Sequence, residues 1–207
     1  MPTFAQVSET YICNLALRKV GAPTIKTIEV ADTSEPADLC RLFYPQVRDA
    51  VLSMYPWKCA MARAQLVASA TAPAFGFSNQ FPLPNGSSSV PYCLRVLRMN
   101  DQSWEYKIEG RMLLTNASTV QIVYTGRIAE PTQYGQLLIQ ALYTSLAAEI
   151  STSMKQSTSF TASLIEQVEN VIIPMAYTAD AQQNSMELME TTDFLEARLQ
   201  TNGTVVL

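Results

Sequence analysis

The residues of this chain that could carry out acid–base chemistry are its carboxylates, because the sequence contains no histidine. Glu105 and Glu109 are the nearest candidates for a catalytic pair, and hydrolysis of a glycosidic bond needs only two acidic groups. Lys107 lies between them, and alternate residues of a strand share one face. A charged, alternating pattern of this kind is typical of a solvated strand face, so we do not interpret the pair as catalytic.

The remaining residue types favour no other common chemistry. Without histidine, neither a Ser-His-Asp nor a Cys-His arrangement can be built. No glycine-rich phosphate-binding motif occurs. Cys13, Cys40, Cys59 and Cys93 are far apart and form no C-x-x-C pair, so we expect buried free thiols rather than a zinc site or disulfides. We therefore predict that the protein is not an enzyme and has no catalytic residues, cofactor or metal site.

Charge is distributed unevenly along the chain. Residues 1–148 hold twelve basic and ten acidic side chains, whereas residues 149–207 hold two basic and eight acidic ones. Four of these acids recur at every third position and would line one side of a helix: Glu187, Glu190, Asp193 and Glu196. We interpret them as solvated charge or as charge facing a channel, which would let DNA pass without sticking.

A basic and aromatic segment lies near the middle of the sequence. It contains Arg95, Arg98, Lys107 and Arg111, close to Trp104 and Tyr106. Such a sheet could stack bases. However, the arginines are expected on both faces of their strand, and glutamates share the segment. We therefore do not expect it to bind nucleic acid.

The elements around these residues begin with helices. Thr3 and Gln6 have the spacing of a capping box, and apolar residues at helical spacing follow until Gly21 and Pro23. A second helix is predicted from about residue 34 to Met54, with a kink or break at Pro45.

Residues 68–91 contain no charged side chain and show no periodicity. Their prolines and aromatics favour an extended segment over a regular element. We interpret the stretch as an arm that contacts a neighbouring subunit or another protein, through four apolar residues: Phe75, Phe77, Phe81 and Leu83. A loop folded on its own subunit is the alternative.

A small antiparallel sheet is predicted over residues 92–128. Residues 93–99 form one strand, Trp104, Tyr106 and Ile108 alternate with charged residues on the next, and Gly110-Arg111 makes a turn. Two more strands, 112–114 and 120–124, complete this sheet.

Helices return after Pro131. We predict helices over 134–155 and 160–184, the second kinked at Pro174. The tail after Ser185 is acidic and would order only on contact with a partner. Its apolar residues are Met186, Leu188, Met189, Phe194, Leu195 and Leu199.

This order of elements favours an α+β fold, a helical bundle with an inserted small antiparallel β-sheet, a long extended arm and a C-terminal tail. The predicted parts are N-terminal helices (1–67), arm (68–91), sheet (92–128), C-terminal helices (129–184) and docking tail (185–207). No apolar run reaches the length of a membrane span, so no membrane partner is expected.

Several short motifs occur in a fixed order along the chain. They are Ala16-Leu17-Arg18-Lys19-Val20-Gly21-Ala22-Pro23, Tyr44-Pro45 with Arg48-Asp49, Leu52 with Pro56-Trp57, Ala60, Arg63 and Leu66, Phe75-Gly76-Phe77 with Phe81 and Leu83-Pro84, Leu94-Arg95-Val96, Tyr106-Lys107-Ile108-Glu109-Gly110-Arg111 with Leu113-Leu114-Thr115, then Tyr124, Glu130-Pro131 and Ala141-Leu142 to Leu146-Ala147. Over about residues 12–185 this set resembles the tail tubular protein A family, the head-to-tail adaptors of short-tailed bacteriophages. The acidic residue that the family usually has after Leu-Pro is missing here, where Asn85-Gly86-Ser87 stands.

The resemblance implies a ring of this chain, typically of twelve copies, between the portal protein and the tail nozzle protein. DNA would cross the lumen of the ring without sequence-specific binding, during genome retention and ejection. The protein would be located in the virion at the head–tail junction, after assembly in the host cytoplasm. Two alternatives remain open: a head-completion or stopper protein of another tailed phage, and a tail-associated glycan hydrolase.

Overall fold

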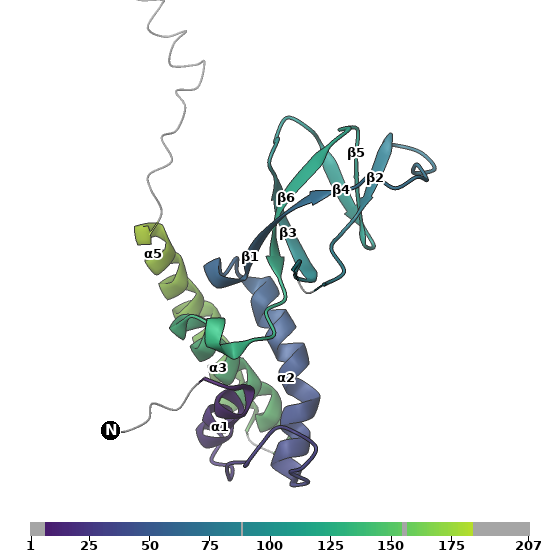
Figure 1. Cartoon of the computed structure of the whole chain (residues 1–207). Helices are drawn as coiled ribbons and strands as arrows, with labels where there is room; N and C mark the ends of the chain where they lie inside the picture. The colour runs from purple at the N-terminus through teal and green to yellow at the C-terminus, as the bar shows by residue number, and fades with distance from the viewer. Residues whose placement is uncertain (1–6, 88, 155–156, 184–207) are drawn as a thin grey trace, which may run out of the picture. The chain divides into compact units, whose positions relative to one another are not determined.

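The computed structural model describes residues 7–87, 89–154 and 157–183. The chain divides into two compact units, Met1–Ala176 and Tyr177–Leu207. The first is a mixed unit of helices and two three-stranded antiparallel sheets (Figure 1), as the predicted α+β class requires. The predicted tail 185–207 lies outside the described residues.

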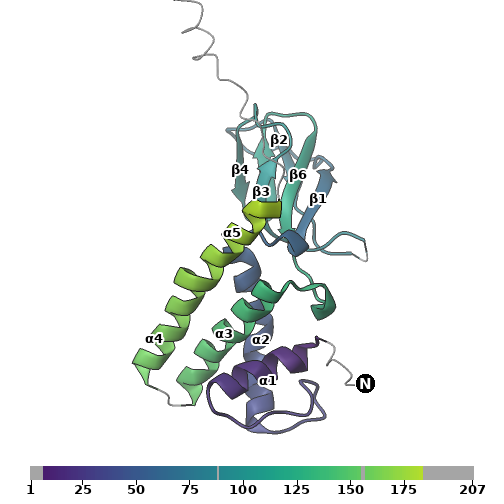
Figure 2. The same ribbon diagram turned by 90° about the vertical axis from the view of Figure 1, so that its left-hand side faces the viewer.

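The helices of the first unit surround one apolar core. α1 (Glu9–Lys19), α2 (Glu35–Met54) and α4 (Thr158–Gln167) pack around α3 (Gln136–Ser153), as Figure 2 shows. Fully buried side chains such as Ile12, Leu17, Val51, Leu138 and Leu146 fill the space between them. These helices are therefore held by an apolar face that packs inward, and not by propensity alone.

α1 begins after Ser8, whose hydroxyl accepts a hydrogen bond from the Tyr11 amide. The predicted capping box, Thr3 and Gln6, lies outside the described residues. At the other end Lys19 donates from Nζ to Thr144 Oγ1 (3.0 Å) and Gln167 Oε1 (2.9 Å), which ties α1 to α3 and α4. Partial burial lowers the pKa of this lysine.

α2 continues through Pro45, so the break that was one of the two predicted outcomes there, beside a kink, does not occur. A proline inside a helix removes one backbone hydrogen bond and costs about 3 kcal/mol. Tyr44, Val47 and Val51 on the same helix are buried against the core, and this packing outweighs the local cost.

The predicted helix over 160–184 is divided. α4 is followed by a π-helical turn, η3 (Val168–Ile172), and then by α5 (Ile173–Gln183). Pro174 is the second residue after the turn ends, and a proline ring clashes with the carbonyl four residues earlier in a regular helix. The wider turn at the expected position is thus the irregularity that Pro174 imposes.

The strands form two sheets with the orders β1-β6-β3 and β2-β5-β4. Their bounds are β1 Met61–Leu66, β2 Asn79–Pro82, β3 Cys93–Met99, β4 Tyr106–Glu109, β5 Met112–Thr115 and β6 Val120–Gly126. β4 and β5 form a hairpin through Gly110-Arg111, and Gly110 has φ +59°, a left-handed value that glycine adopts without strain. Both sheets contribute to a second core, which includes Phe81, Leu113 and Tyr124.

Two strands were not predicted. β1 falls in residues 61–66, which the sequence interpretation placed with the N-terminal helices, and it pairs with β6. β2 falls inside the predicted arm and pairs with β5. In both cases the partner strand is distant in sequence, so the local pattern carried little information about the pairing.

The predicted arm is therefore corrected in part. Phe81 is 1% exposed and Leu83 is also buried, and both belong to the second core rather than to a free arm. The loop between β1 and β2 projects from the strands in Figure 1, and Phe75 in this loop is 88% exposed.

Candidate functional site

Asp49 of α2 connects the helices to the strands. Its carboxylate accepts hydrogen bonds from Arg127, just after β6, through Nε (3.1 Å) and Nη2. Arg48 donates to the same carboxylate from Nε (3.2 Å) and lies 3.8 Å from Glu9 of α1. One partly buried carboxylate thus fixes two guanidinium groups that come from different layers.

Tyr92 extends this connection into the second sheet. The guanidinium of Arg127 lies 4.4 Å from the centre of its ring, and that of Arg111 lies 4.1 Å from it. Arg111 also donates to the carbonyl oxygens of Cys93 (2.7 Å) and Pro84. We call the group of Asp49, Tyr92, Arg111 and Arg127 the joint, because it links α2, both sheets and the segment 84–92.

A close backbone contact adds to the joint. A Cβ atom on Gly126 would lie 2.6 Å from Cβ of Pro91, so only glycine fits there. The hydroxyl of Tyr124 donates to the Pro91 carbonyl oxygen (3.1 Å), which holds the two segments together. The joint is therefore a packed connection between α2 and the strands.

A second candidate region is the outer face of the sheet β1-β6-β3, where we define the arginine face as Arg63, Arg95 and Arg98. Arg63 and Arg98 both pair with Val123, from opposite sides, and Arg95 pairs with Thr125 two residues along β6. Paired residues lie on the same face of a sheet, so the three arginines share one face.

The arrangement depends on irregularities in β3. Residues 95 and 98 differ by an odd number, and in a regular strand they would lie on opposite faces. The register of β3 on β6 shifts between Cys93 and Arg95 and again between Val96 and Arg98. The second shift brings Arg98 to the face of Arg95. The expectation that the arginines lie on both faces of the strand is therefore wrong.

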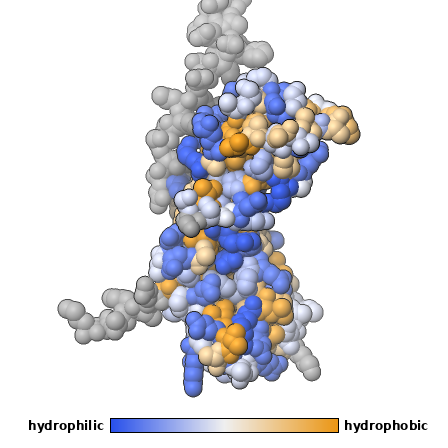
Figure 3. Space-filling view, turned by 45° about the vertical axis from the view of Figure 1, so that its right-hand side comes forward, coloured by the Kyte–Doolittle hydropathy of each residue, from blue (hydrophilic) through white to orange (hydrophobic). Residues whose placement is uncertain are grey.

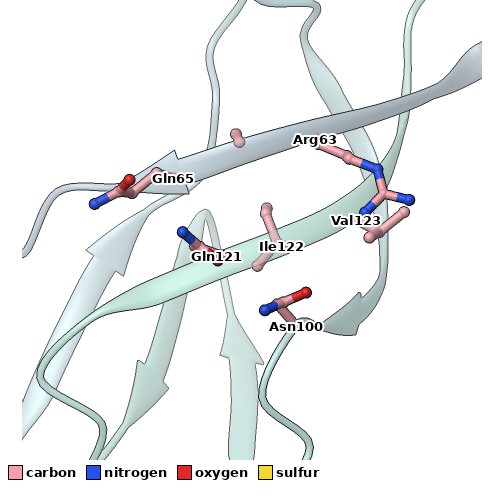
Figure 4. Close-up of a pocket in the computed structure, with 7 residues that line it drawn as sticks. Arg63, Gln65, Asn100, Gln121, Ile122 and Val123 are labelled. Carbon is pink, nitrogen blue, oxygen red and sulfur yellow. The ribbon is translucent and has the colours of Figure 1, made fainter.

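The arginine face is exposed, and no carboxylate in the described ranges lies within ion-pair distance of its three arginines. Arg95 donates from Nη1 to the Ser53 carbonyl oxygen at the end of α2 (3.1 Å). A hollow of about 260 Å³ lies on this sheet beside Arg63. Figure 4 shows the Arg63 guanidinium beside Val123, with Gln65, Gln121 and Asn100 around the hollow.

The projecting loop is a third candidate region. Phe75 and Phe77 lie beside a hollow that Lys107, Glu109 and Met112 also line. Apolar colour extends over a projecting part of the strand-rich surface in Figure 3. Of the four predicted arm residues, Phe75 is the one whose side chain is largely available to a partner, whereas Phe77 is half-buried.

The other predicted site residues fall into two groups. The apolar tail residues and the four stepped acids, Glu187, Glu190, Asp193 and Glu196, lie outside the described residues. Glu105 and Glu109 are exposed, and only Glu109 lines the hollow beside Phe75.

Three of the four cysteines are buried in the cores. Cys13, Cys40 and Cys93 are buried free thiols, as predicted, whereas Cys59 is exposed. A hydrogen bond with Cys40, together with burial, raises the pKa of Cys13. Burial also raises the pKa of Cys93, so these two thiols are poor nucleophiles at neutral pH.

Among residues 7–87, 89–154 and 157–183, no group of three potential metal-ligand side chains comes together. No helix in these ranges has both the length and the apolar character needed to cross a membrane. No protein-family model and no curated protein matches the chain.

Proposed function

We propose that this protein is a structural head-to-tail adaptor of a short-tailed bacteriophage, forming a ring between the portal protein and the tail nozzle. The observation that carries the proposal is the joint. Asp49 and Arg111 belong to the sequence segments that resemble the adaptor family. Asp49 links α2 to the end of β6, and Arg111 links the β4–β5 hairpin to β3 and the segment 84–92. In the joint, charged side chains hold segments of the chain together. Such a use of charge suits a protein that works by its shape.

In this proposal each copy is a wedge of the ring. A chain of 207 residues has a radius of gyration of about 17 Å as a compact domain, so twelve plain globules would leave a hole wider than duplex DNA. The C-terminal helices α3, α4 and α5 are proposed to form the radial part of the wedge. Among the acids Glu187, Glu190, Asp193 and Glu196, those that do not pair with another chain would then face the lumen and repel DNA phosphates.

Two regions are proposed to contact other chains. The loop that carries Phe75 would insert into an adjacent subunit or the nozzle protein, because an exposed phenylalanine gains about 1.5–3 kcal/mol when it is fully buried. The tail after Ser185 would dock on the portal protein or on a neighbouring copy. Its ordering at that step would keep the free monomer from assembling before a portal is present.

Electron microscopy of the full-length chain mixed with the purified portal protein of its phage tests the function. We expect a collar of the chain bound to the end of the portal that faces the tail, typically of twelve copies. Portal alone and chain alone are the controls, and neither should give a collar.

A chain that does not bind the portal, or that lies elsewhere in the mature particle, would refute the adaptor function. Release of sugars from cell-wall or surface glycans by the purified chain would instead favour the hydrolase. That activity should disappear in Glu105→Gln/Glu109→Gln.

A further inference from the structure

The arginine face is a surface of one charge sign that has no acidic partner among the described residues. Arg63, Arg95 and Arg98 are exposed on one side of the sheet β1-β6-β3, and the described carboxylates lie beyond ion-pair distance from all three. Guanidinium groups form bidentate hydrogen bonds with carboxylates and phosphates. The occupant that this face fits best is therefore anionic.

The hollow on the same face limits the kind of anion. Its lining combines Arg63 with polar Gln65 and Gln121 and with apolar Ala64 and Val123. None of the described residues that line this hollow is aromatic, so they offer no platform for stacking bases. Basic and apolar lining together suit a protein segment in which acids alternate with apolar side chains, better than they suit a nucleic acid.

Such a segment is present in this chain. Residues 184–207 carry four acidic side chains and one basic side chain, Arg198. Apolar residues are interspersed among the acids, including Met186, Leu188 and Phe194. The sign of the charge and the mixture with apolar residues both complement the arginine face.

We propose that the arginine face is the docking site for residues 184–207 of a second copy of this chain. The inference rests on the proposed function, because a ring needs a heterologous contact in which one part of a subunit meets a different part of the next. Glu187 and Glu190 pair with guanidinium groups of the face. Neighbouring apolar residues of the segment enter the hollow beside Val123.

A fluorescent peptide of residues 184–207, titrated with the full-length chain and followed by anisotropy, tests this docking. We expect saturable binding that weakens between about 50 mM and about 500 mM salt, because exposed charge pairs are screened. Arg63→Glu/Arg98→Glu should weaken binding at least about tenfold. The matched control Arg18→Glu/Lys26→Glu changes the net charge equally, at exposed positions that form no ion pair with a described residue, and should change the affinity less than about twofold.

Charge reversal in the peptide gives the decisive comparison. A peptide with Glu187→Arg/Glu190→Arg should bind Arg63→Glu/Arg98→Glu more tightly than the natural peptide does, and should bind the wild-type chain more weakly. Thermal melts of each variant show whether its fold is intact.

Three results would overturn the docking site: no binding of the natural peptide, equal weakening in both double variants, or no recovery with the reversed peptide. Tighter binding of a short DNA duplex than of the peptide would make the face a nucleic-acid site and would overturn it as well. The titration contains no portal protein. A negative titration therefore refutes the docking site alone, whereas the adaptor function is tested separately by collar formation on the portal protein.

Discussion

At the scale of single residues, Asp49 and Arg111 hold separate segments of the chain together. Asp49 receives hydrogen bonds from Arg48 and Arg127, and Arg111 donates to backbone carbonyl groups beside Tyr92. Each charge is used to fix a segment. The consequences of changing these residues should therefore appear in stability first.

Asp49→Ala should lower the free energy of unfolding by about 1–3 kcal/mol, because it leaves two partly buried guanidinium groups without their acceptor. Chemical denaturation measures this loss. Asp38→Ala is the control on the same helix. Asp38 is 65% exposed in its pair with Arg41, whereas Asp49 is 25% exposed, so the control should cost less than about 1 kcal/mol. Equal losses in the two variants would contradict a structural role of the joint.

Gly126→Ala should destabilise the protein by about 1–3 kcal/mol, since the new methyl group would overlap with Pro91. A double-mutant cycle with Pro91→Gly measures the cause directly. If overlap is responsible, the combined variant should lose less stability than the sum of the two single variants. Additive losses would show that some other property of glycine is needed at this position.

At the scale of elements, one stretch of sequence is divided between a strand and a loop. Asn79–Pro82 pairs with Met112–Thr115 and buries Phe81, while the preceding loop exposes Phe75. The two phenylalanines are six positions apart in the same uncharged stretch, yet they differ in burial. We therefore expect substitution of Phe81 to lower stability, and substitution of Phe75 to weaken binding to another chain.

Phe75→Ser should change the free energy of unfolding by less than about 0.5 kcal/mol, because the side chain is already in solvent. It should weaken binding to the neighbouring subunit or nozzle. Phe81→Ser should cost about 3–5 kcal/mol, because it removes a ring from the second core. Denaturation curves and collar formation on the portal separate the two. Normal collars with Phe75→Ser would argue against a contact role for the loop.

At the scale of the whole molecule, buried tyrosines link stability to alkaline pH. Burial raises the pKa values of Tyr44, Tyr124 and Tyr134 above the ordinary value of 10.0. The unfolded chain therefore loses phenolic protons before the folded chain does. Their contribution is complete below pH 10.0 and is lost as the pH rises toward the folded-state values.

Thermal melts between pH 8 and pH 11 should show stability falling above about pH 10. Tyr44→Phe should make this fall less steep, because it removes one of the titrating groups. At neutral pH the same variant should lose at most about 1.5 kcal/mol, since the polar neighbour of the Tyr44 hydroxyl is Tyr134, whose own hydrogen bond to the Ile128 carbonyl oxygen remains. An unchanged alkaline slope in Tyr44→Phe would show that other groups control the transition.

Local pattern in the sequence was sufficient for much of the fold. The α+β class, the strand Cys93–Met99, the turn at Gly110 and the irregularity before Pro174 were all predicted. Each depends on residues close together in the chain, such as alternation along a strand or the fixed geometry of proline. The candidate interaction residues were harder to predict, because exposure depends on what packs above a side chain.

Only the tertiary structure decided which strands pair and which faces they present. β1 and β6 are distant in sequence, and their pairing placed Arg63 beside Val123. The register shifts of β3 placed Arg95 and Arg98 on one face, although their spacing predicts two. Pairing and register depend on contacts between distant segments, and a one-residue shift exchanges the faces of a strand. The arginine face therefore came from the fold, while the acidic character of the tail could be read from the sequence alone.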